Sequence, residues 1–279
     1  MKLARLGAVA IGATAAVLLF GTAQATAAPD RKDVGIQSFS NGVALSGDWN
    51  GDGIDTPGLF DFSTGVWLLR NSNDSGDPQI VFQYGDEGEF GFPVVGDWNG
   101  DGIDTVGLVR GGDWFLRNSN TTGGANVSFT YGDPNESGFP VVGDWDNNNT
   151  DTPGLIRDNQ WLLRNSNTTG GANVSFTYGD QGEIGFPVVG DWNGDGSDTP
   201  GLVRNGTWLL RNSNSAGGAD IGLSYGDPIP VHWPVTGDWD GNNTDTPGVV
   251  DFNTDPEHIL WFLRNSNTTG NADVTFTYF

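Results

Sequence analysis

The sequence predicts an all-β fold, a five-bladed β-propeller in which every blade is a four-stranded antiparallel sheet. The tripeptide Gly-Asp-Trp recurs at spacings of 49, 47, 47 and 47 residues, beginning at Gly47, Gly96, Gly143, Gly190 and Gly237. A fixed period of this size indicates one supersecondary unit that buries its apolar faces against its neighbours. Within each unit, β-branched and aromatic runs alternate with Gly, Asn and Asp at intervals of about 8–12 residues, a pattern that indicates short strands separated by turns.

Each unit is expected to contain four strands. In the fourth unit the predicted strand segments are 186–192, 198–204, 206–214 and 219–226. Four short strands per repeat are typical of a propeller blade. A linear stack of sheets is the alternative, but its two end faces would be apolar and uncapped. We therefore expect residues 42–279 to form five complete blades, closed into a ring.

The N-terminus reads as a secretory signal of the bacterial type. Lys2 and Arg5 form a short basic start, residues 6–20 are apolar, and Ala25-Thr26-Ala27 is a small-residue cleavage site. A membrane anchor is the alternative, but the apolar run is shorter than the ~20 residues that a spanning helix needs. We predict that residues 1–27 are removed and that the protein is secreted.

Residues 28–41 are predicted to be a leader, in which residues 36–39 could add a closing strand. No later stretch is apolar enough to cross a bilayer, so no membrane span is expected after signal cleavage. The chain has no cysteine, so its stability must come from its core, from bound metal or from both.

The chain is strongly acidic. It holds 12 Lys and Arg against 35 Asp and Glu, a formal net charge of −23, and loss of the signal would make this about −25. Such a charge argues against nucleic acid and anionic membrane surfaces as partners. Eleven Trp and sixteen Phe oppose disorder, so a folded protein must tolerate the charge, and bound cations would help it to do so.

The large aromatic residues follow the repeat. Ten of the eleven Trp occupy two repeat positions, one in Gly-Asp-Trp and the other at Trp67, Trp114, Trp161, Trp208 and Trp261. All five Tyr occupy a third position, at the end of the fourth strand. These rings could stack on a ligand, or they could fill the space between blades. We favour the second interpretation.

The turn after each Gly-Asp-Trp carries the chemistry that we expect of this protein. Oxygen side chains at alternate positions, with a Gly that permits a left-handed turn, can wrap a hard cation such as Ca²⁺. Softer metals would lack ligands, because the chain has no Cys and only two His. In the first, second and fourth units, the candidate ligands are Asp48, Asn50, Asp52 and Asp55; Asp97, Asn99, Asp101 and Asp104; and Asp191, Asn193, Asp195 and Asp198.

In the third and fifth units, Asp and Asn exchange places but three carboxylates remain. The candidate ligands there are Asp144, Asp146, Asn148 and Asp151, and Asp238, Asp240, Asn242 and Asp245. Asn replaces the loop Gly, and Asn is the residue that best tolerates positive φ after Gly. Turn chemistry alone would not require a constant number of carboxylates, whereas a metal site would. The alternative is a set of Asx turns with solvated acids.

The pattern Asp-x-Asn-x-Asp-Gly within propeller repeats resembles the FG-GAP/VCBS repeats, which include the N-terminal propeller of integrin α subunits. The resemblance covers residues from about 42 to 279. It implies calcium in the loop between the first two strands of each blade, and a role in adhesion or ligand binding. The family pattern has an acid at the ninth loop position, where this chain has Thr56 and its equivalents. Here the last acid stands one position earlier, as in Asp55, and a shift of one residue in a strand reverses the side chain's direction.

An Arg closes the third strand of every unit, at Arg70, Arg117, Arg164, Arg211 and Arg264. Five such Arg, with Asn and Trp nearby, could bind sugars or an acidic ligand. We favour a structural role in which each Arg pairs with an acid of its own blade, the eighth-position Asp of the loop being the expected partner.

The repeat is broken in the fifth unit, where both His residues lie. His232, Trp233, Glu257 and His258 fall in this segment. His232 with Glu257 is the only acid–base pair that the sequence offers, and nothing in the sequence places the two together. We interpret the segment as sequence drift and do not predict an enzyme.

The sequence thus predicts a secreted, monomeric, calcium-binding propeller that serves as an extracellular binding or adhesion module. Its partner would be an extracellular protein or a glycan. The first alternative is a lectin with carbohydrate sites between the blades. The second is an enzyme acting on polysaccharides.

Overall fold

A computed structural model describes residues 42–85, 91–132, 138–182, 185–227, 232–252 and 259–278. The predicted signal, the leader and its closing strand lie outside these residues. The described part of the chain contains strands, turns and loops, and no helix in it is long and apolar enough to span a membrane.

The described chain forms five sheets of four strands each. The first sheet holds β1 (Gly42–Gly47), β2 (Thr56–Asp61), β3 (Val66–Leu69) and β4 (Ile80–Gln83). The second holds β5 (Phe92–Gly96), β6 (Thr105–Arg110), β7 (Asp113–Leu116) and β8 (Val127–Thr130). The third holds β9 (Phe139–Gly143), β10 (Thr152–Arg157), β11 (Gln160–Leu163) and β12 (Val174–Thr177).

The last two sheets repeat this plan. The fourth holds β13 (Phe186–Gly190), β14 (Thr199–Arg204), β15 (Thr207–Leu210) and β16 (Ile221–Ser224). The fifth holds β17 (His232–Gly237), β18 (Thr246–Asp251), β19 (Ile259–Leu263) and β20 (Val274–Tyr278). In every sheet the strands pair antiparallel in sequence order, so each blade is a simple meander.

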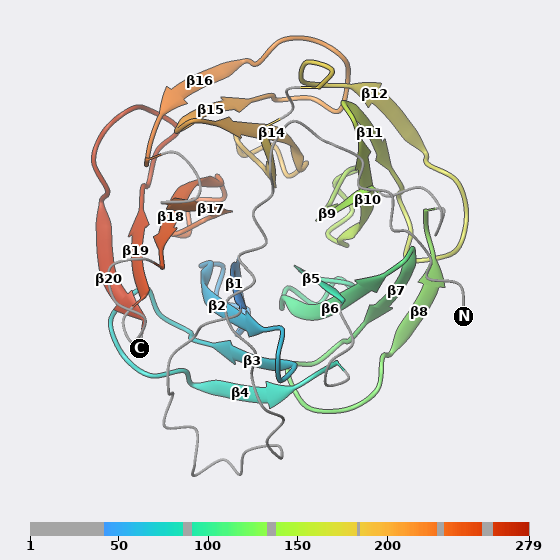
Figure 1. The fold of residues 1–279 in the computed structure, drawn as a ribbon, viewed down its shortest axis with the longest axis vertical. Coiled ribbons are helices and arrows are strands. Elements are labelled where there is room, and N and C mark those ends of the chain that lie inside the picture. Colours follow the sequence, from blue (N-terminus) through green and yellow to red (C-terminus); the bar gives the residue numbers. More distant parts are fainter. Residues whose placement is uncertain are drawn as a thin grey trace, which may run out of the picture.

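The five sheets stand around a central axis, with the first strand of each blade innermost and the fourth outermost (Figure 1). The ring is closed between the first and last blades, because the N–H of Asp55 donates to the carbonyl of Asp238 at 2.9 Å. The predicted five-bladed propeller is therefore confirmed, and the linear stack of sheets is wrong.

The hydrophobic core lies between adjacent blades. One cluster joins Trp49, Trp67 and Phe82 of the first blade to Val106 and Leu108 of the second. The Trp of the third strand is fully buried in all five blades, and in four of them it stacks on a Phe of the fourth strand, as Trp67 does on Phe82 with centroids 6.5 Å apart. The Trp of Gly-Asp-Trp is at most 5% exposed in every blade. The interpretation of the repeated Trp as inter-blade filling is confirmed.

Three of the repeated Tyr residues link their blade to the next by a hydrogen bond. The hydroxyl of Tyr84 in the first blade donates to the carbonyl of Phe115 in the second at 2.9 Å. Tyr131 and Tyr178 make the same bond to Leu162 and Leu209. In these three residues the ring fills space between two blades while the hydroxyl is satisfied by backbone, whereas the buried Tyr225 hydroxyl has no hydrogen-bond partner among the described residues.

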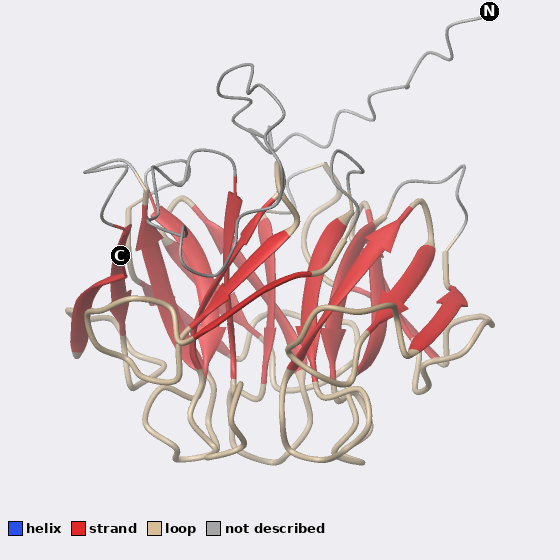
Figure 2. Cartoon of the chain, turned by 90° about the horizontal axis from the view of Figure 1, so that it is seen from below, coloured by secondary structure: helices blue, strands red, loops and turns tan. Residues whose placement is uncertain are grey.

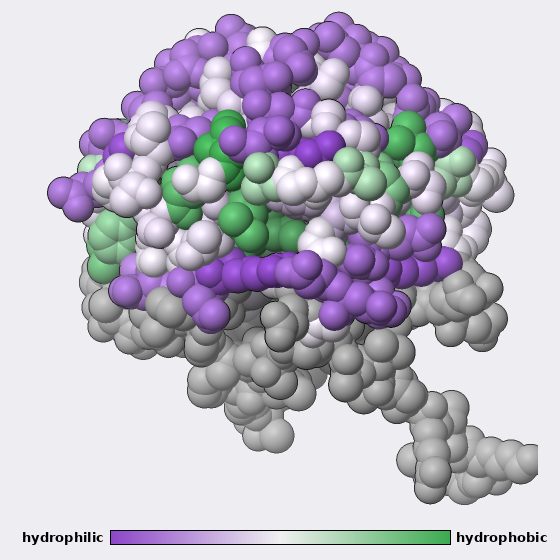
Figure 3. Space-filling model, turned by 90° about the horizontal axis from the view of Figure 1, so that it is seen from above, coloured by the Kyte–Doolittle hydropathy of each residue, from purple (hydrophilic) through white to green (hydrophobic). Residues whose placement is uncertain are grey.

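The loops between first and second strands gather at one end of the ring, at the bottom of Figure 2. Hydrophilic residues cover this end in the space-filling view, where it lies at the top, and hydrophobic residues show along the flank (Figure 3). The predicted calcium loops therefore share one face of the molecule.

Candidate calcium loops and the inter-blade clasp

The first carboxylate of each loop is held by the loop's own backbone. In the first blade, Asp48 Oδ1 accepts hydrogen bonds from the N–H groups of Gly51 at 2.7 Å and Asp52 at 3.2 Å, and Oδ2 accepts from Gly53 at 2.7 Å. Gly53 has φ of +82°, which lets its N–H point inward. The loop is therefore wound around its first Asp.

The third and fifth loop positions face each other across the same turn. Asn50 Nδ2 donates to Asp52 Oδ2 at 2.9 Å, and Asp52 Oδ1 accepts from the N–H of Ile54 at 3.0 Å. The second and fourth blades repeat these contacts with Asn99 and Asp101 and with Asn193 and Asp195. Three oxygen-bearing side chains are thus brought together in each of these loops.

The third and fifth blades reach the same winding without the second loop Gly. Asn149 and Asn243 both have φ of +60°. Their N–H groups donate at 2.6 Å to the first carboxylate, that of Asp144 or Asp238. The expectation that Asn replaces Gly in a left-handed turn is confirmed.

The eighth-position Asp of each loop contacts the neighbouring blade. Asp104 of the second blade accepts at Oδ2 a hydrogen bond of 2.8 Å from the backbone N–H of Asp48 in the first, and its own N–H donates to the Asp48 carbonyl at 2.8 Å. We call this two-bond contact the inter-blade clasp. It is repeated by the pairs Asp151 with Asp97, Asp198 with Asp144, Asp245 with Asp191, and Asp55 with Asp238.

The clasp explains the Gly of Gly-Asp-Trp. A Cβ placed on Gly143 would stand 2.7 Å from Cβ and 2.9 Å from Oδ2 of Asp198. The same conflict arises at the other four motif glycines. Gly therefore leaves room for the carboxylate of the next blade, and the following Asp offers its N–H to that carboxylate.

The clasp carboxylates are partly buried and repel one another. Burial raises the pKa of Asp55, Asp151 and Asp198 well above the usual range, and nearby carboxylates raise these pKa values further. Burial likewise raises the pKa of Asp104 and Asp245 to about 7, although the hydrogen bond from the neighbouring backbone opposes this. The five clasp carboxylates are therefore easier to protonate than ordinary carboxylates.

The second Asn of each Arg-Asn-Ser-Asn segment strengthens this region, a role that the sequence did not reveal. Asn167 Nδ2 donates to the carbonyl of Asp151 in its own blade at 2.9 Å and to that of Trp98 in the preceding blade at 3.3 Å. Equivalent bonds to the clasp Asp are made by Asn73, Asn120, Asn214 and Asn267. The fivefold repetition of Arg-Asn-Ser-Asn is the feature of the sequence from which this role could have been inferred.

Ten Asn oxygens in these segments are buried without a hydrogen-bond partner among the described residues. They are the Oδ1 atoms of Asn71, Asn73, Asn118, Asn120, Asn165, Asn167, Asn212, Asn214, Asn265 and Asn267. In the third blade, Asn165 Nδ2 donates to Asp146 Oδ2 of the loop at 2.9 Å. The unpartnered oxygen of Asn165 thus belongs to a side chain that touches the candidate ligand set.

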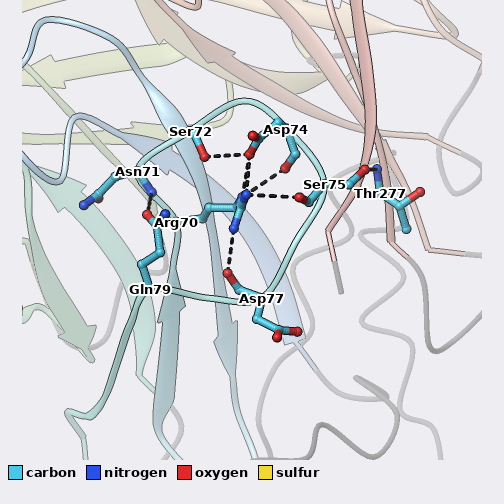
Figure 4. A network of polar contacts seen from close by, with 8 residues as sticks. All are labelled: Arg70, Asn71, Ser72, Asp74, Ser75, Asp77, Gln79 and Thr277. Carbon is cyan, nitrogen blue, oxygen red and sulfur yellow. Dashed lines mark hydrogen bonds and ion pairs between the residues drawn. The ribbon is translucent and has the colours of Figure 1, made fainter.

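The repeated Arg has the structural role that we favoured, and Arg70, Arg211 and Arg264 pair with acids of their own blades. The expected partner, the eighth-position Asp of the loop, is wrong. Arg70 donates to the carbonyls of Asp74 at 2.9 Å and Asp77 at 2.8 Å, and also pairs with the Asp74 carboxylate (Figure 4). Ser75 in the same loop accepts a bond of 3.2 Å from the N–H of Thr277 in the last blade. The Arg therefore folds the β3–β4 loop, while the clasp Asp bonds to backbone instead.

The repeat-breaking segment is described only in part. His232 Nδ1 accepts a hydrogen bond from the N–H of Asp227 at 2.8 Å, and the ring lies 5.7 Å from that of Phe262. Glu257 and His258 lie outside the described residues. The imidazole thus contacts both the segment that follows the fourth blade and a ring of its own blade, and its pairing with Glu257 stays untested.

The donor set of each loop fits calcium in kind. In the described chain no three Asp, Glu, His or Cys side chains are close enough to form a metal cluster of their own. Each loop nevertheless keeps two carboxylates and an amide side chain near one another, and calcium accepts carboxylate, amide, backbone and water oxygens together. The assignment of all twenty candidate ligands stays a prediction.

The chain shows only low sequence identity to the solved structures that it resembles. No family model matches the chain, and no curated protein matches it. Among solved structures, it is similar to a lectin of Agrocybe aegerita that recognises non-reducing terminal N-acetylglucosamine, with 16% identity, a TM-score of 0.47, and coverage of 87% of this chain and 68% of the lectin. A BBS1N chain in complex with ARL6DN gives 10% identity, a TM-score of 0.42, and coverage of 83% and 82%. Such distant likeness transfers no function.

Proposed function

We propose that this protein is an exported, calcium-stabilised propeller of the FG-GAP/VCBS type that acts as an extracellular binding or adhesion module and not as an enzyme. The observation that carries the proposal is the fivefold coincidence of a wound acidic loop with buried, unpartnered Asn oxygens. In the third blade these two features are in direct contact, through Asn165 and Asp146.

The unpartnered oxygens favour a bound cation on energetic grounds. Leaving a buried acceptor unsatisfied costs about 1–3 kcal/mol, and the chain repeats this cost in every blade. A cation beside the loop would satisfy such oxygens and would also lower the repulsion of a chain with a net charge of −23. Amide oxygens, carboxylates and the absence of Cys favour calcium over softer metals.

The first, third and fifth loop positions would hold the ion, as Asp48, Asn50 and Asp52 in the first blade. The metal would supply fixed positive charge where the loop now relies on its own N–H groups. It would thereby rigidify the loops that form one face of the ring. A rigid, polar face on a scaffold is a common way of presenting a binding surface.

Calcium titration of thermal unfolding tests the proposal. Protein stripped with EGTA should gain about 2.7 kcal/mol per independent site at a calcium concentration 100 times Kd, so five sites would raise Tm clearly. Isothermal titration calorimetry should give five Ca²⁺ per chain, and Mg²⁺ at equal concentration should have a much smaller effect.

Single-loop variants supply the control. Asp52→Asn removes one loop carboxylate and should reduce the stoichiometry by one ion. Asp158→Asn removes one exposed charge elsewhere and should leave the stoichiometry unchanged, since Asn205 occupies the same turn in the fourth blade with nearly the same φ, +50° against +52°. If millimolar calcium leaves Tm unchanged, the loops are turns and not metal sites.

A further inference from the structure

Four aromatic side chains form an arc around the axis of the ring. The innermost strands β5, β9, β13 and β17 each carry one, at or next to the first residue of the strand (Figure 1). The ring centroids of Phe92 and Phe139 lie 4.9 Å apart, those of Phe139 and Phe186 5.8 Å, and those of Phe186 and Trp233 4.8 Å. The interplanar angles of 71°, 74° and 67° are those of edge-to-face pairs, a favourable arrangement. We call these four side chains the aromatic collar.

The collar has a gap at the first blade. The strand register places Val43 where the second and fifth blades have Phe92 and Trp233. A short side chain thus stands where each of the other four blades has a large ring. Phe92, on one side of the gap, is 36% exposed and is the one large hydrophobic side chain that is exposed among the described residues. The collar therefore lacks one apolar group, and the place of that group is beside Val43.

The chain enters the propeller at this gap. Residues 28–41 lead directly into β1, which begins at Gly42. Every described sheet is complete with four strands of its own repeat, so no blade needs the closing strand that we expected at residues 36–39. Phe39 is three residues from Gly42, which limits its distance from Gly42 to about 11 Å even in an extended chain. The leader is thus tethered next to the collar.

The leader carries the kind of side chain that the gap lacks. Phe39 is its only aromatic residue, and Ile36 precedes it by three positions. Removing apolar surface from water is favourable in proportion to its area, which applies both to this ring and to Phe92. A short tether also gives the segment an effective concentration of about millimolar or more at the collar. Even a weak contact would therefore be largely formed, and a separate partner would have to compete with it.

We propose that the leader packs on the aromatic collar and places the Phe39 ring in the gap beside Val43, against Phe92. The chain's own N-terminal segment then covers this apolar surface, and a partner reaches the collar only by displacing it. The collar lies where the first strands begin, whereas the acidic loops follow the ends of these strands. The inference therefore concerns the opposite end of the ring and does not rest on calcium binding.

The repeat supplies a variant that fills the gap from within. Val43→Phe copies the residue of the second, third and fourth blades and should exclude Phe39 from the collar. Val43→Ile enlarges the side chain without adding a ring and is the matched control. Phe92→Leu removes the ring that Phe39 would contact, and gives a second route to the same result. Thermal melts of all three variants verify that they fold.

The experiment is limited proteolysis of the full chain by chymotrypsin, which cleaves after Phe, with cleavage after Phe39 followed by mass spectrometry. We expect cleavage at least tenfold slower in the wild type than in a synthetic peptide of residues 33–44. Val43→Phe and Phe92→Leu should each accelerate it tenfold or more, and Val43→Ile should leave it unchanged. Phe39→Ser should lower Tm in the wild type and leave Tm unchanged in Val43→Phe.

The proposal is overturned if the wild type is cleaved as fast as the peptide, or if Val43→Phe and Phe92→Leu are cleaved no faster than the wild type. Protection that weakens on dilution would assign the collar to a second copy of the chain and would also overturn it. The same digestion in EGTA and in calcium should give equal protection of Phe39. Loss of protection with a calcium-dependent Tm would reject this inference alone, and protection without any calcium effect on Tm would reject the calcium proposal alone.

Discussion

At the scale of single residues, the eighth-position Asp is the most informative side chain. It stands among the acids of a predicted metal loop, yet its carboxylate bonds to the backbone of the preceding blade, as Asp151 does to the N–H of Asp97 at 2.7 Å. Sequence position alone suggested a ligand of its own loop. The strand that follows carries the side chain toward the neighbouring blade instead.

The clasp predicts opposite effects for two substitutions of Asp151. Asp151→Asn keeps an oxygen that can accept the hydrogen bond from the Asp97 N–H. It also removes a carboxylate whose pKa is raised by burial, so in EGTA at pH 8 this variant should have a higher Tm. Asp151→Ala leaves the Asp97 N–H without its partner and should cost about 1–3 kcal/mol. Thermal unfolding of both variants checks this. Equal destabilisation by the two would contradict the clasp.

The raised pKa values predict a pH dependence of unfolding. A carboxylate whose folded pKa exceeds its unfolded pKa binds more protons in the native state, so its stabilising contribution is present at low pH and lost as pH rises through the folded pKa. For Asp104 and Asp245 the folded pKa is about 7. In EGTA, Tm should therefore fall between about pH 5 and pH 8. In Asp104→Asn the slope should be shallower, and an unchanged slope would exclude Asp104 as the titrating group.

At the scale of elements, the β3–β4 loop is built around one Arg in every blade. In the third blade, Arg164 donates to the carbonyls of Thr168 at 2.6 Å, Thr169 at 3.1 Å and Gly171 at 2.7 Å. The planar guanidinium directs these bonds at fixed angles. Such a loop owes its order to a side chain rather than to strand pairing.

Arg164→Lys should loosen this loop without unfolding the blade. A Lys ammonium cannot reproduce the fork of hydrogen bonds, so several carbonyls would lose their donor. Hydrogen exchange of the amides in residues 165–173 should become faster, by at least tenfold. The equivalent loop of the fourth blade, residues 212–220, keeps Arg211 and serves as the internal control. Faster exchange in both loops would indicate global destabilisation instead.

At the scale of the whole molecule, the acidic charge is carried by a closed ring. With a net charge of −23, self-repulsion opposes the compact state, and salt screens it. In EGTA, raising NaCl to about 0.5 M should increase Tm. At matched ionic strength, calcium should increase Tm well beyond the NaCl effect if the loops bind it. Equal shifts would mean screening alone.

Much of the fold could be predicted from sequence because the pattern is written five times. The period fixed the number of blades, and the spacing of apolar runs fixed four strands in each. The repeated Trp indicated buried inter-blade contacts, since a large aromatic side chain at a fixed repeat position is expected to fill the same space in every blade. The candidate loops could be located for the same reason, with Asn149 and Asn243 recognised as substitutes for Gly.

Individual hydrogen bonds between blades, such as the following three, could not be predicted, because they join residues 56 to 183 positions apart whose relative placement no local pattern encodes. Asp104 bonds to Asp48, Asn167 to Trp98, and Asp55 to Asp238 across the closure. The Arg was expected to pair with the eighth-position Asp of its own blade, whereas it donates to carbonyls of its own β3–β4 loop.

The sequence by itself determined the class of fold, the number of blades, the acidic loops and the buried aromatic positions, since periodicity and residue type act locally and repeat identically. Only the tertiary structure decided where each carboxylate points and which Asn oxygens are left without partners. Those features depend on closing the ring, which brings side chains of neighbouring blades within hydrogen-bonding distance.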